Sequence, residues 1–491
     1  MIYHCEDHTC NYWDEGEKLP ERCPQCGRKL LRANEADMTG DDWTALGNTL
    51  SDAEASDKKR MVDCFRKAAY LGSAWGVCNL GICMEQGNGV EADPVQAFWL
   101  YQQAVEMGSL NAVCCLGVCY EYGIGTAPDA KQAAELYCKA AEYGSPRGQM
   151  LLAHAFHDGI GVEADAAEAV YWVRAAAYQR YGEGMHRLGV CYEYGDGVEQ
   201  NWERAVHWFR EAAESGVSVA MADLGYCYEK GCGVEQSWEQ AFSWYRRGAE
   251  CGYPVSMSNL GLCYKRGYGV EQNWQEAIKW YEQGAQCGDL QSMHNLARCY
   301  ERGEGVEQDM KKAICWYERA AEQNHPAAMN SLGECYAMGL GVPRDLETAM
   351  EWYRRAAELG EAMADYNMGW HLEQAGKLSE AYAHYRKAAD GNDDSAWWAL
   401  GRFYENGVVV AQDGKEARRC YETGEKLGSV KCKMRLARCK LLGIGGRRAK
   451  KAGLDLCRQA LELAKESSEK EDYGYEAEMN LLRRTIAENE S

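Results

Sequence analysis

The sequence predicts an all-α protein, a right-handed superhelical α-solenoid of about twelve helix–turn–helix repeats, with a small metal-binding module at its N-terminus. Three observations predict it. A leucine, once replaced by methionine, is followed by a small residue and recurs mostly at intervals of 36 residues; apolar residues surround it at helical spacing, and only 8 prolines stand against 52 glycines in 491 residues. A single hairpin of this size cannot bury its own apolar face, so the hairpins are expected to stack.

Composition restricts the classes of function. Acidic residues outnumber basic ones by 75 to 54, a net charge of −21, which disfavours a general nucleic-acid binder because phosphate backbones are repelled. The first residues have no basic and apolar leader, and no apolar run reaches the roughly 18 residues of a membrane helix, so we expect no transmembrane segment. We expect a cytoplasmic protein whose 24 cysteines are reduced.

Four cysteines in two close pairs define the N-terminal module, residues 1–32. Cys5 and Cys10 form the first pair, and Cys23 and Cys26 form the second. This pattern fits one tetrahedral thiolate site, and we predict one zinc ion, with iron as the alternative. The wider spacing of the first pair leaves His8 as a possible substitute ligand, and four unligated thiols are the plain alternative. Residues 33–40 are expected to be a linker.

The first helix of each repeat is amphipathic. Around the recurring leucine, here called the anchor, apolar or small residues lie on one face, as in Ser256, Met257, Leu260, Cys263 and Tyr264. A Gly-x-Gly pair then ends the helix, because glycine readily adopts the positive φ of a helix end. The anchors are Leu46, Leu80, Leu116, Leu152, Leu188, Leu224, Leu260, Leu296, Leu332, Met368, Leu400 and Leu436.

The second helix begins thirteen residues after the anchor, at a row of capping residues. The predicted N-caps are Asp93, Asp129, Asp165, Asn201, Ser237, Asn273, Asp309, Asp345 and Asp413. The second helix also carries a tryptophan followed by a tyrosine or phenylalanine. We predict that the tryptophans bury large areas between repeats: Trp208, Trp244, Trp280, Trp316 and Trp352. The solenoid is expected to span residues 41–465, and residues 466–491 to form a C-terminal capping helix and tail.

The repeat resembles the Sel-1-like repeat, a relative of the tetratricopeptide repeat, as residues 256–284 (SMSNLGLCYKRGYGVEQNWQEAIKWYEQG) illustrate. The resemblance implies a scaffold or adaptor that binds other proteins, and it implies no reaction. The repeat at 364–391 lacks the Gly-x-Gly loop and is closer to a plain tetratricopeptide hairpin. Residues 3–27 resemble rubredoxin-like zinc ribbons, including Tyr12–Trp13 and the C-P-x-C-G knuckle.

The residues opposite the buried face of each first helix predict a concave protein- or peptide-binding groove. They include aromatic and apolar side chains, whereas a solvated face would be charged. They also include cations, which could bind carboxylates of a peptide, and asparagines, which could form hydrogen bonds with its backbone. The alternative is that superhelical curvature buries these rows between repeats. The groove residues are Tyr122, Val190, Tyr194, Tyr226, Lys230, Asn259, Leu262, Arg266, Asn295, Arg298 and Arg302.

A basic patch near the C-terminus could bind an acidic partner or a membrane surface, or form a solvated end face. It comprises Lys431, Lys433, Arg435, Arg438, Lys440, Arg447, Arg448, Lys450 and Lys451. Together with the ribbon, it makes nucleic-acid or membrane-surface docking a third function to consider.

No catalytic residues emerge from the sequence. His154 and His157 lack an evident third ligand and are interpreted as incidental. The Gly-x-Gly turns follow helices and are not phosphate loops.

The second hypothesis is nevertheless an enzyme, either a thiol or iron redox protein or a β-lactam hydrolase, since secreted relatives with regular disulfides are linked to β-lactam hydrolysis. The recurring cysteines are expected to be small buried hydrophobes instead: Cys83, Cys119, Cys191, Cys227, Cys263, Cys299, Cys335 and Cys439.

Overall fold

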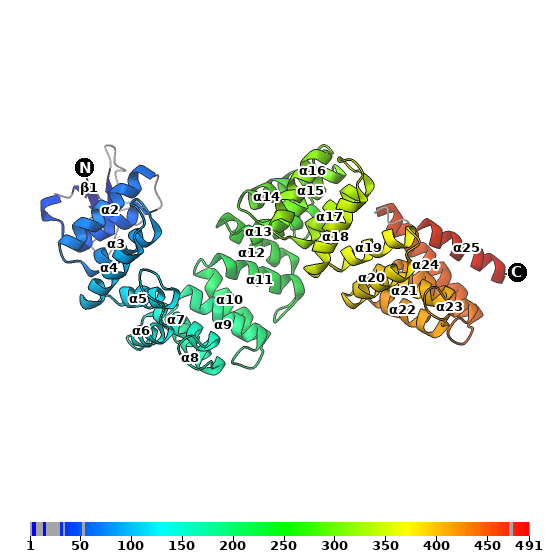
Figure 1. Cartoon of the computed structure of the whole chain (residues 1–491), viewed down its shortest axis with the longest axis horizontal. Helices are drawn as coiled ribbons and strands as arrows, with labels where there is room; N and C mark the ends of the chain where they lie inside the picture. The colour runs from blue at the N-terminus through cyan, green and yellow to red at the C-terminus, as the bar shows by residue number, and fades with distance from the viewer. Residues whose placement is uncertain are drawn as a thin grey trace. The chain divides into compact units, whose positions relative to one another are not determined.

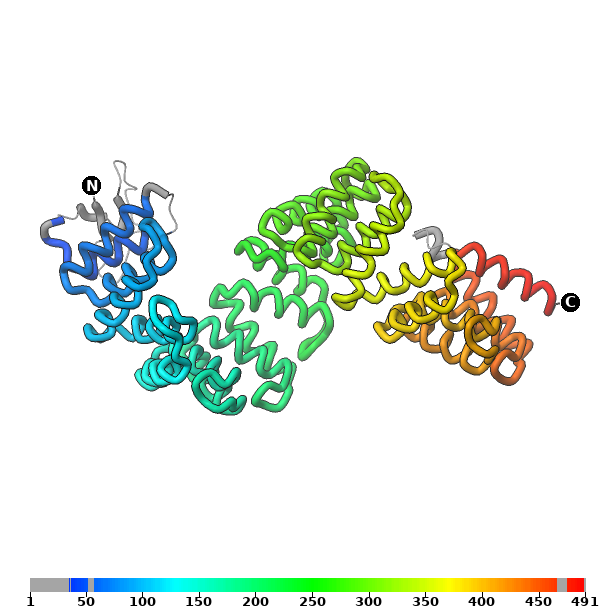
Figure 2. The backbone as a smooth tube through the Cα atoms, in the orientation of Figure 1, coloured from blue at the N-terminus to red at the C-terminus, as the bar shows by residue number. Residues whose placement is uncertain are grey.

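The computed structural model describes residues 2–5, 13–15, 30–32, 35–51, 55–470 and 475–490. They divide into two units, Met1–Cys251 and Gly252–Ser491. Within each unit the helices follow one another as hairpins, and each packs mainly against its neighbours in sequence (Figures 1 and 2). This local contact pattern is that of an α-solenoid.

The first unit begins with a three-stranded antiparallel sheet of order β2-β1-β3. Its strands are β1 (Ile2–Cys5), β2 (Trp13–Glu15) and β3 (Leu30–Arg32). Tyr3 on β1 pairs with Asp14 on β2 and with Arg32 on β3. Of the four predicted metal ligands, Cys10, Cys23 and Cys26 lie outside the described residues, and Cys5 is described only as backbone at the end of β1. The metal site therefore stays a prediction.

Helices occupy the rest of the first unit, and the predicted linker contains a short 3-10 helix, η1 (Glu35–Asp37). The α-helices are α1 (Gly40–Thr49), α2 (Ala55–Tyr70), α3 (Ala74–Gln86), α4 (Pro94–Glu106), α5 (Leu110–Tyr122), α6 (Ala130–Glu142), α7 (Pro146–Asp158), α8 (Ala166–Tyr178), α9 (Gly182–Tyr194), α10 (Trp202–Glu214), α11 (Ser218–Lys230) and α12 (Trp238–Glu250).

The second unit continues the same alternation, in which odd-numbered helices carry the anchor up to α23. Its helices are α13 (Pro254–Arg266), α14 (Trp274–Gln286), α15 (Leu290–Arg302), α16 (Met310–Glu322), α17 (Pro326–Met338), α18 (Leu346–Glu358), α19 (Ala362–Gln374), α20 (Leu378–Asp390), α21 (Asp394–Asn406), α22 (Gly414–Lys426), α23 (Val430–Leu442), α24 (Lys450–Lys470) and α25 (Glu476–Glu490). Because α24 continues to Lys470, the last hairpin extends beyond the predicted boundary at residue 465.

The predicted helix ends are confirmed. Gly123 ends α5 with a φ of 71°, and Gly125 has a φ of 68°. Asp129 then caps α6 by accepting a hydrogen bond from the backbone N–H of Gln132 at 3.0 Å. Every predicted N-cap accepts such a bond. The departing repeat is confirmed as well, since α19 ends at Ala375 with a φ of −80° and only a short turn leads to α20.

The most deeply buried ring of the repeat is the tyrosine, while the five predicted tryptophans are buried or half-buried. Of the five tryptophans, only Trp244 is buried, whereas the aromatic residue after each of them is almost inaccessible. Tyr137, at the same position of an earlier hairpin, packs on Gly117, where an added β-carbon would lie 2.5 Å from the ring. Its hydroxyl donates to Glu121 at 2.6 Å. The tyrosine therefore points into the hairpin, and the tryptophan lies at its edge.

Several of the tryptophans are covered by cations one turn later on the same helix. Arg247 lies 4.2 Å from the ring centre of Trp244, and Arg355 lies 4.4 Å from that of Trp352. Such cation–π contacts suit rings that are still reached by water. The cysteines of the anchor-plus-three row are buried, as predicted.

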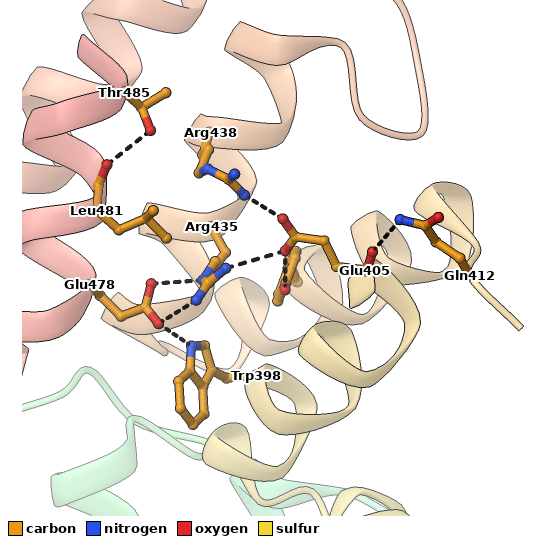
Figure 3. A network of polar contacts seen from close by, with 9 residues as sticks. Trp398, Glu405, Gln412, Arg435, Arg438, Glu478, Leu481 and Thr485 are labelled. Atoms are coloured by element: carbon orange, nitrogen blue, oxygen red, sulfur yellow. Dashed lines mark hydrogen bonds and ion pairs between the residues drawn. The ribbon is translucent and has the colours of Figure 1, made fainter. Parts of the chain in front are cut away.

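The predicted C-terminal helix is α25, and it packs on α23 and α24 (Figure 1). Arg435 of α23 donates to both carboxylate oxygens of Glu478 at 2.7 and 2.8 Å, and Trp398 donates its indole N–H to Glu478 at 3.2 Å (Figure 3). Glu405 accepts from Arg435 at 3.3 Å and from Arg438. This network connects the last two hairpins of the second unit, α21–α22 and α23–α24, to α25.

Candidate partner-binding surface

In the first unit, the predicted groove displays three exposed tyrosines on odd-numbered helices. Tyr122 and Tyr194 are the last residues of α5 and α9, and their side chains are 65% and 73% exposed. Tyr226 on α11 is 44% exposed, with Lys230 Nζ 5.8 Å from its ring centre. Val190 is half-buried. Stacking of the repeats therefore leaves these three rings accessible.

In the second unit, the predicted groove residues are mainly polar and basic. Arg266 and Arg302 are exposed at the ends of α13 and α15. Arg302 lies 3.8 Å from Glu304, an exposed ion pair that contributes little to stability. Arg298 is half-buried on α15, and Asn295 accepts from Gln291 at 3.2 Å. Asn259 and Leu262 are half-buried on α13. This part of the surface can present cations to an acidic ligand.

The predicted basic patch is divided by the fold. Arg435 and Arg438 face Glu405 and Glu478 inside the second unit, so neither presents a free charge to solvent (Figure 3). Lys431 lies 5.2 Å from the ring centre of Trp398, and burial lowers its pKa.

The other basic residues of the patch differ in exposure. Arg448 donates to Asn489 at 2.7 Å and so contacts α25. Lys433 and Lys440 are half-buried, and Arg447, Lys450 and Lys451 are exposed. The sequence could not show that acidic residues 30 to 43 positions away face the two arginines.

A cavity of about 420 Å³ lies among α7, α8 and α9, and of its lining residues the sequence analysis had singled out His154, His157 and Cys191. His154 Nε2 lies 3.1 Å from Asp158 Oδ2, and His157 lies between Asp158 and Asp196, with Nε2 3.2 Å from Asp196 Oδ2. The hydrogen bond with His157 lowers the pKa of Asp158. Arg187 approaches Asp196 at 3.6 Å. The histidines therefore belong to a polar cluster at the edge of a cavity.

The described residues offer little for metal or thiol chemistry. Among the side chains that the structure describes, no three His, Cys, Asp or Glu residues are grouped so as to hold a metal ion. Burial raises the pKa of Cys83 to about 11 and that of Cys227 to about 12. Cys115 differs, because a hydrogen bond with Cys78 and the nearby Arg147 lower its pKa to about 7. Cys115 is buried, which limits its access to solvent reagents.

No helix in the described part of the chain combines the length and apolar character needed to cross a membrane.

Helical hairpins with a glycine-terminated first helix, a capped second helix and a buried Gly–Tyr contact define a tetratricopeptide-like repeat protein. The family model of the Sel1 repeat matches residues 76–109, 112–145, 146–181, 182–217, 218–253, 254–289, 290–325, 326–361, 362–393 and 396–429. The chain belongs to the Sel1 repeat family.

A solved structure agrees with this assignment. A protective antigen present in uropathogenic Escherichia coli strains, which displays an SLR fold, matches with 29% identity and a TM-score of 0.58. That match covers 87% of this chain and 94% of the antigen. A Sel1 repeat protein from Oxalobacter formigenes is 31% identical over 50% of this chain and 96% of its own, with a TM-score of 0.46. No curated protein matches the chain. Sel1 repeat solenoids are typically protein-interaction scaffolds.

Proposed function

We propose that this protein is a non-enzymatic, cytoplasmic adaptor that binds a protein or peptide partner on the face formed by its odd-numbered helices. The exposed tyrosines Tyr122, Tyr194 and Tyr226 are the observation that carries this proposal; the first two lie six residues after the anchor on α5 and α9, and the third lies two residues after the anchor on α11. Exposed rings of this size mark interaction sites, because tyrosine buries a large area at low cost in side-chain entropy. A reducing compartment suits the free thiols of the described cysteines.

Charge supports a partner with acidic groups at the second unit. Arg266, Arg298 and Arg302 lie on the same face of α13 and α15, and they are half-buried or exposed. Guanidinium groups bind carboxylates through paired, charge-assisted hydrogen bonds. Lys230 adds a cation beside Tyr226 in the first unit.

We also propose that Cys5, Cys10, Cys23 and Cys26 hold one zinc ion in the N-terminal module. Four thiolates in two close pairs are the donor set that structural zinc prefers. The short strands β1 to β3 provide too small a core to fold alone, so a bound metal would stabilise them. The role assigned to the metal is structural.

The partner proposal is tested with matched pairs of tyrosine variants. Partners are identified by affinity purification with cross-linking from the native cell, and binding is then measured with the purified partner. Tyr194→Ala with Tyr226→Ala should weaken binding at least tenfold, as expected for the loss of two aromatic contacts. Thermal unfolding should be unchanged, because both rings are exposed.

The control is Tyr70→Ala with Tyr143→Ala. These tyrosines are 92% and 68% exposed at the ends of the even-numbered helices α2 and α6. The control pair should bind the partner as the wild type does. If both pairs weaken binding equally, or neither does, the proposed surface is wrong.

A further inference from the structure

The buried ring of the repeat is missing from one hairpin in the middle of the first unit. The neighbouring hairpins place an aromatic residue 21 positions after the anchor, Tyr137 before it and Phe209 after it. The hairpin of α7 and α8, with its anchor at Leu152, has Val173 there instead. Valine lacks the volume of a ring, so space opens beside it.

Three positions have changed together in this hairpin. In the preceding hairpin, Gly117 makes room for the ring of Tyr137, whose hydroxyl donates to Glu121 at 2.6 Å. The corresponding residues are Ala153, Val173 and His157. The ring, its supporting glycine and its hydrogen-bond acceptor have all been replaced. His157 occupies the position of Glu121, the residue that accepts the tyrosine hydroxyl in the preceding hairpin, and its imidazole still offers a polar atom there.

The space left by the ring is the cavity among α7, α8 and α9. Its volume is about 420 Å³, within the usual range for ligand pockets. Met150, Ala153, Val170 and Val173 line it and form an apolar floor. An aromatic ring from outside the chain can therefore occupy the position that the repeat's own ring fills in the neighbouring hairpins.

The edge of the cavity is polar and reaches solvent. His157 and Asp158 side chains are 40% and 44% exposed, and Arg187 on the opposite helix is 41% exposed. Asp158 and Asp196 can accept a hydrogen bond from a phenol, as Glu121 does from Tyr137. An apolar floor with carboxylates and imidazoles at its edge suits a ring with a hydroxyl at its far end.

We infer that this cavity is an anchor pocket for a tyrosine side chain of a partner polypeptide. The inference rests on the proposed function, because the pocket opens on α7 and α9 between the helices that carry Tyr122 and Tyr194. The surface then has two kinds of contact. Tyr122 and Tyr194 of this chain pack on the partner, and the pocket binds a tyrosine of the partner. Aromatic anchors in fully lined pockets typically dominate such interfaces.

The first test uses p-cresol, the tyrosine side chain as a free molecule, with methyl NMR of the whole chain. Saturable shifts are expected for the methyl groups of Met150, Ala153 and Val173, with a dissociation constant on the order of 1 mM for a ligand of this size. Absence of saturable shifts at these methyl groups, or equal shifts over the whole surface, would overturn the inference.

The matched variant rebuilds the ordinary repeat. Ala153→Gly with Val173→Tyr restores the ring and the glycine beneath it, so p-cresol binding should weaken at least tenfold. Ala153→Gly with Val173→Phe, which copies the Gly189–Phe209 pair of the next hairpin, is the second variant should the first fail to fold. Unchanged p-cresol binding in a folded variant would show that p-cresol does not occupy this cavity.

A second measurement distinguishes a polypeptide from a free phenol. The capped tripeptide acetyl-Ala-Tyr-Ala-amide should bind at least threefold more tightly than p-cresol, and acetyl-Ala-Leu-Ala-amide should bind more weakly than either. Equal binding of p-cresol and the tyrosine peptide would contradict a polypeptide ligand. The p-cresol titration needs no partner, so its failure is distinguishable from failure of the tyrosine-surface experiment.

Discussion

Glu478 of α25 accepts two hydrogen bonds from Arg435 of α23, at 2.7 and 2.8 Å, and both side chains are largely buried. The contact joins the C-terminal helix to the last anchor-bearing helix of the second unit (Figure 3). Burying two charges is costly, so removing one of them leaves the other without compensation. This ion pair therefore contributes to the docking of α25, together with the apolar contacts of Leu482.

We predict that Glu478→Ala loosens the docking of α25. Glu405 still faces Arg435 at 3.3 Å and offsets part of the loss, so the expected cost is about 3 kcal/mol, at the lower end for a broken buried pair. Hydrogen exchange of residues 476–490 should become roughly 100-fold faster. Glu462→Ala, in an exposed pair with Lys465, is the control and should have little effect. Equal exchange in the two variants would contradict this role.

Gly117→Ala should destabilise the first unit by about 1–3 kcal/mol, because the new β-carbon would overlap the ring of Tyr137. Chemical denaturation measures the loss. Combining it with Tyr137→Val reproduces the Ala153–Val173 pair of the next hairpin. The double variant should then be more stable than the sum of the single effects predicts. Strictly additive effects would show that glycine and ring do not depend on one another.

His294 should make the second unit sensitive to acid. It is buried on α15, and burial lowers its pKa to about 3. Below the usual histidine pKa of 6.5, the unfolded chain binds a proton that the folded chain does not, so stability falls as the pH falls. The expected loss between pH 7 and pH 5 is about 2 kcal/mol.

The variant His294→Met, which copies Met150 at the same repeat position, removes this titration. Its unfolding temperature should fall less between pH 7 and pH 5 than that of the wild type. His207→Met changes an exposed histidine on α10 and serves as the control. A wild-type and a His294→Met protein with the same pH dependence would contradict the explanation.

Metal analysis tests the N-terminal module. We expect one zinc per chain and a colourless protein, and Cys23→Ser with Cys26→Ser should lose the metal. The solenoid should unfold at the same temperature, because its hairpins have their own buried cores. A red protein containing iron would favour the redox alternative, and a metal-free wild type would overturn the site.

The repeat could be predicted from sequence because its signals are local. Helix ends depend on single residues, such as Gly123 and Asp129, whose conformational and capping preferences act within one turn. The choice between tryptophan and tyrosine as the buried ring could not be made in this way. Both fit an amphipathic helix, and only the contact of Tyr137 with Gly117 distinguishes them.

Two features of the candidate sites were not predicted from the sequence: ion pairs between residues far apart in the chain, and the cavity beside Val173. Arg435 and Arg438 were read as an exposed patch, but they face Glu405 and Glu478 from other helices. The cavity could have been found from one signal, the break in the aromatic row at Val173. That signal becomes meaningful once the ring is known to fill the hairpin interior.

Hydroxyl-radical footprinting of the purified complex tests the central claim most directly, since it reads out every exposed tyrosine at once. Binding of the partner should reduce oxidation of Tyr122, Tyr194 and Tyr226 at least fivefold and leave Tyr70 and Tyr143 unchanged. Protection of Tyr70 and Tyr143, with the three tyrosines of the odd-numbered helices still oxidised as in the free protein, would contradict the account.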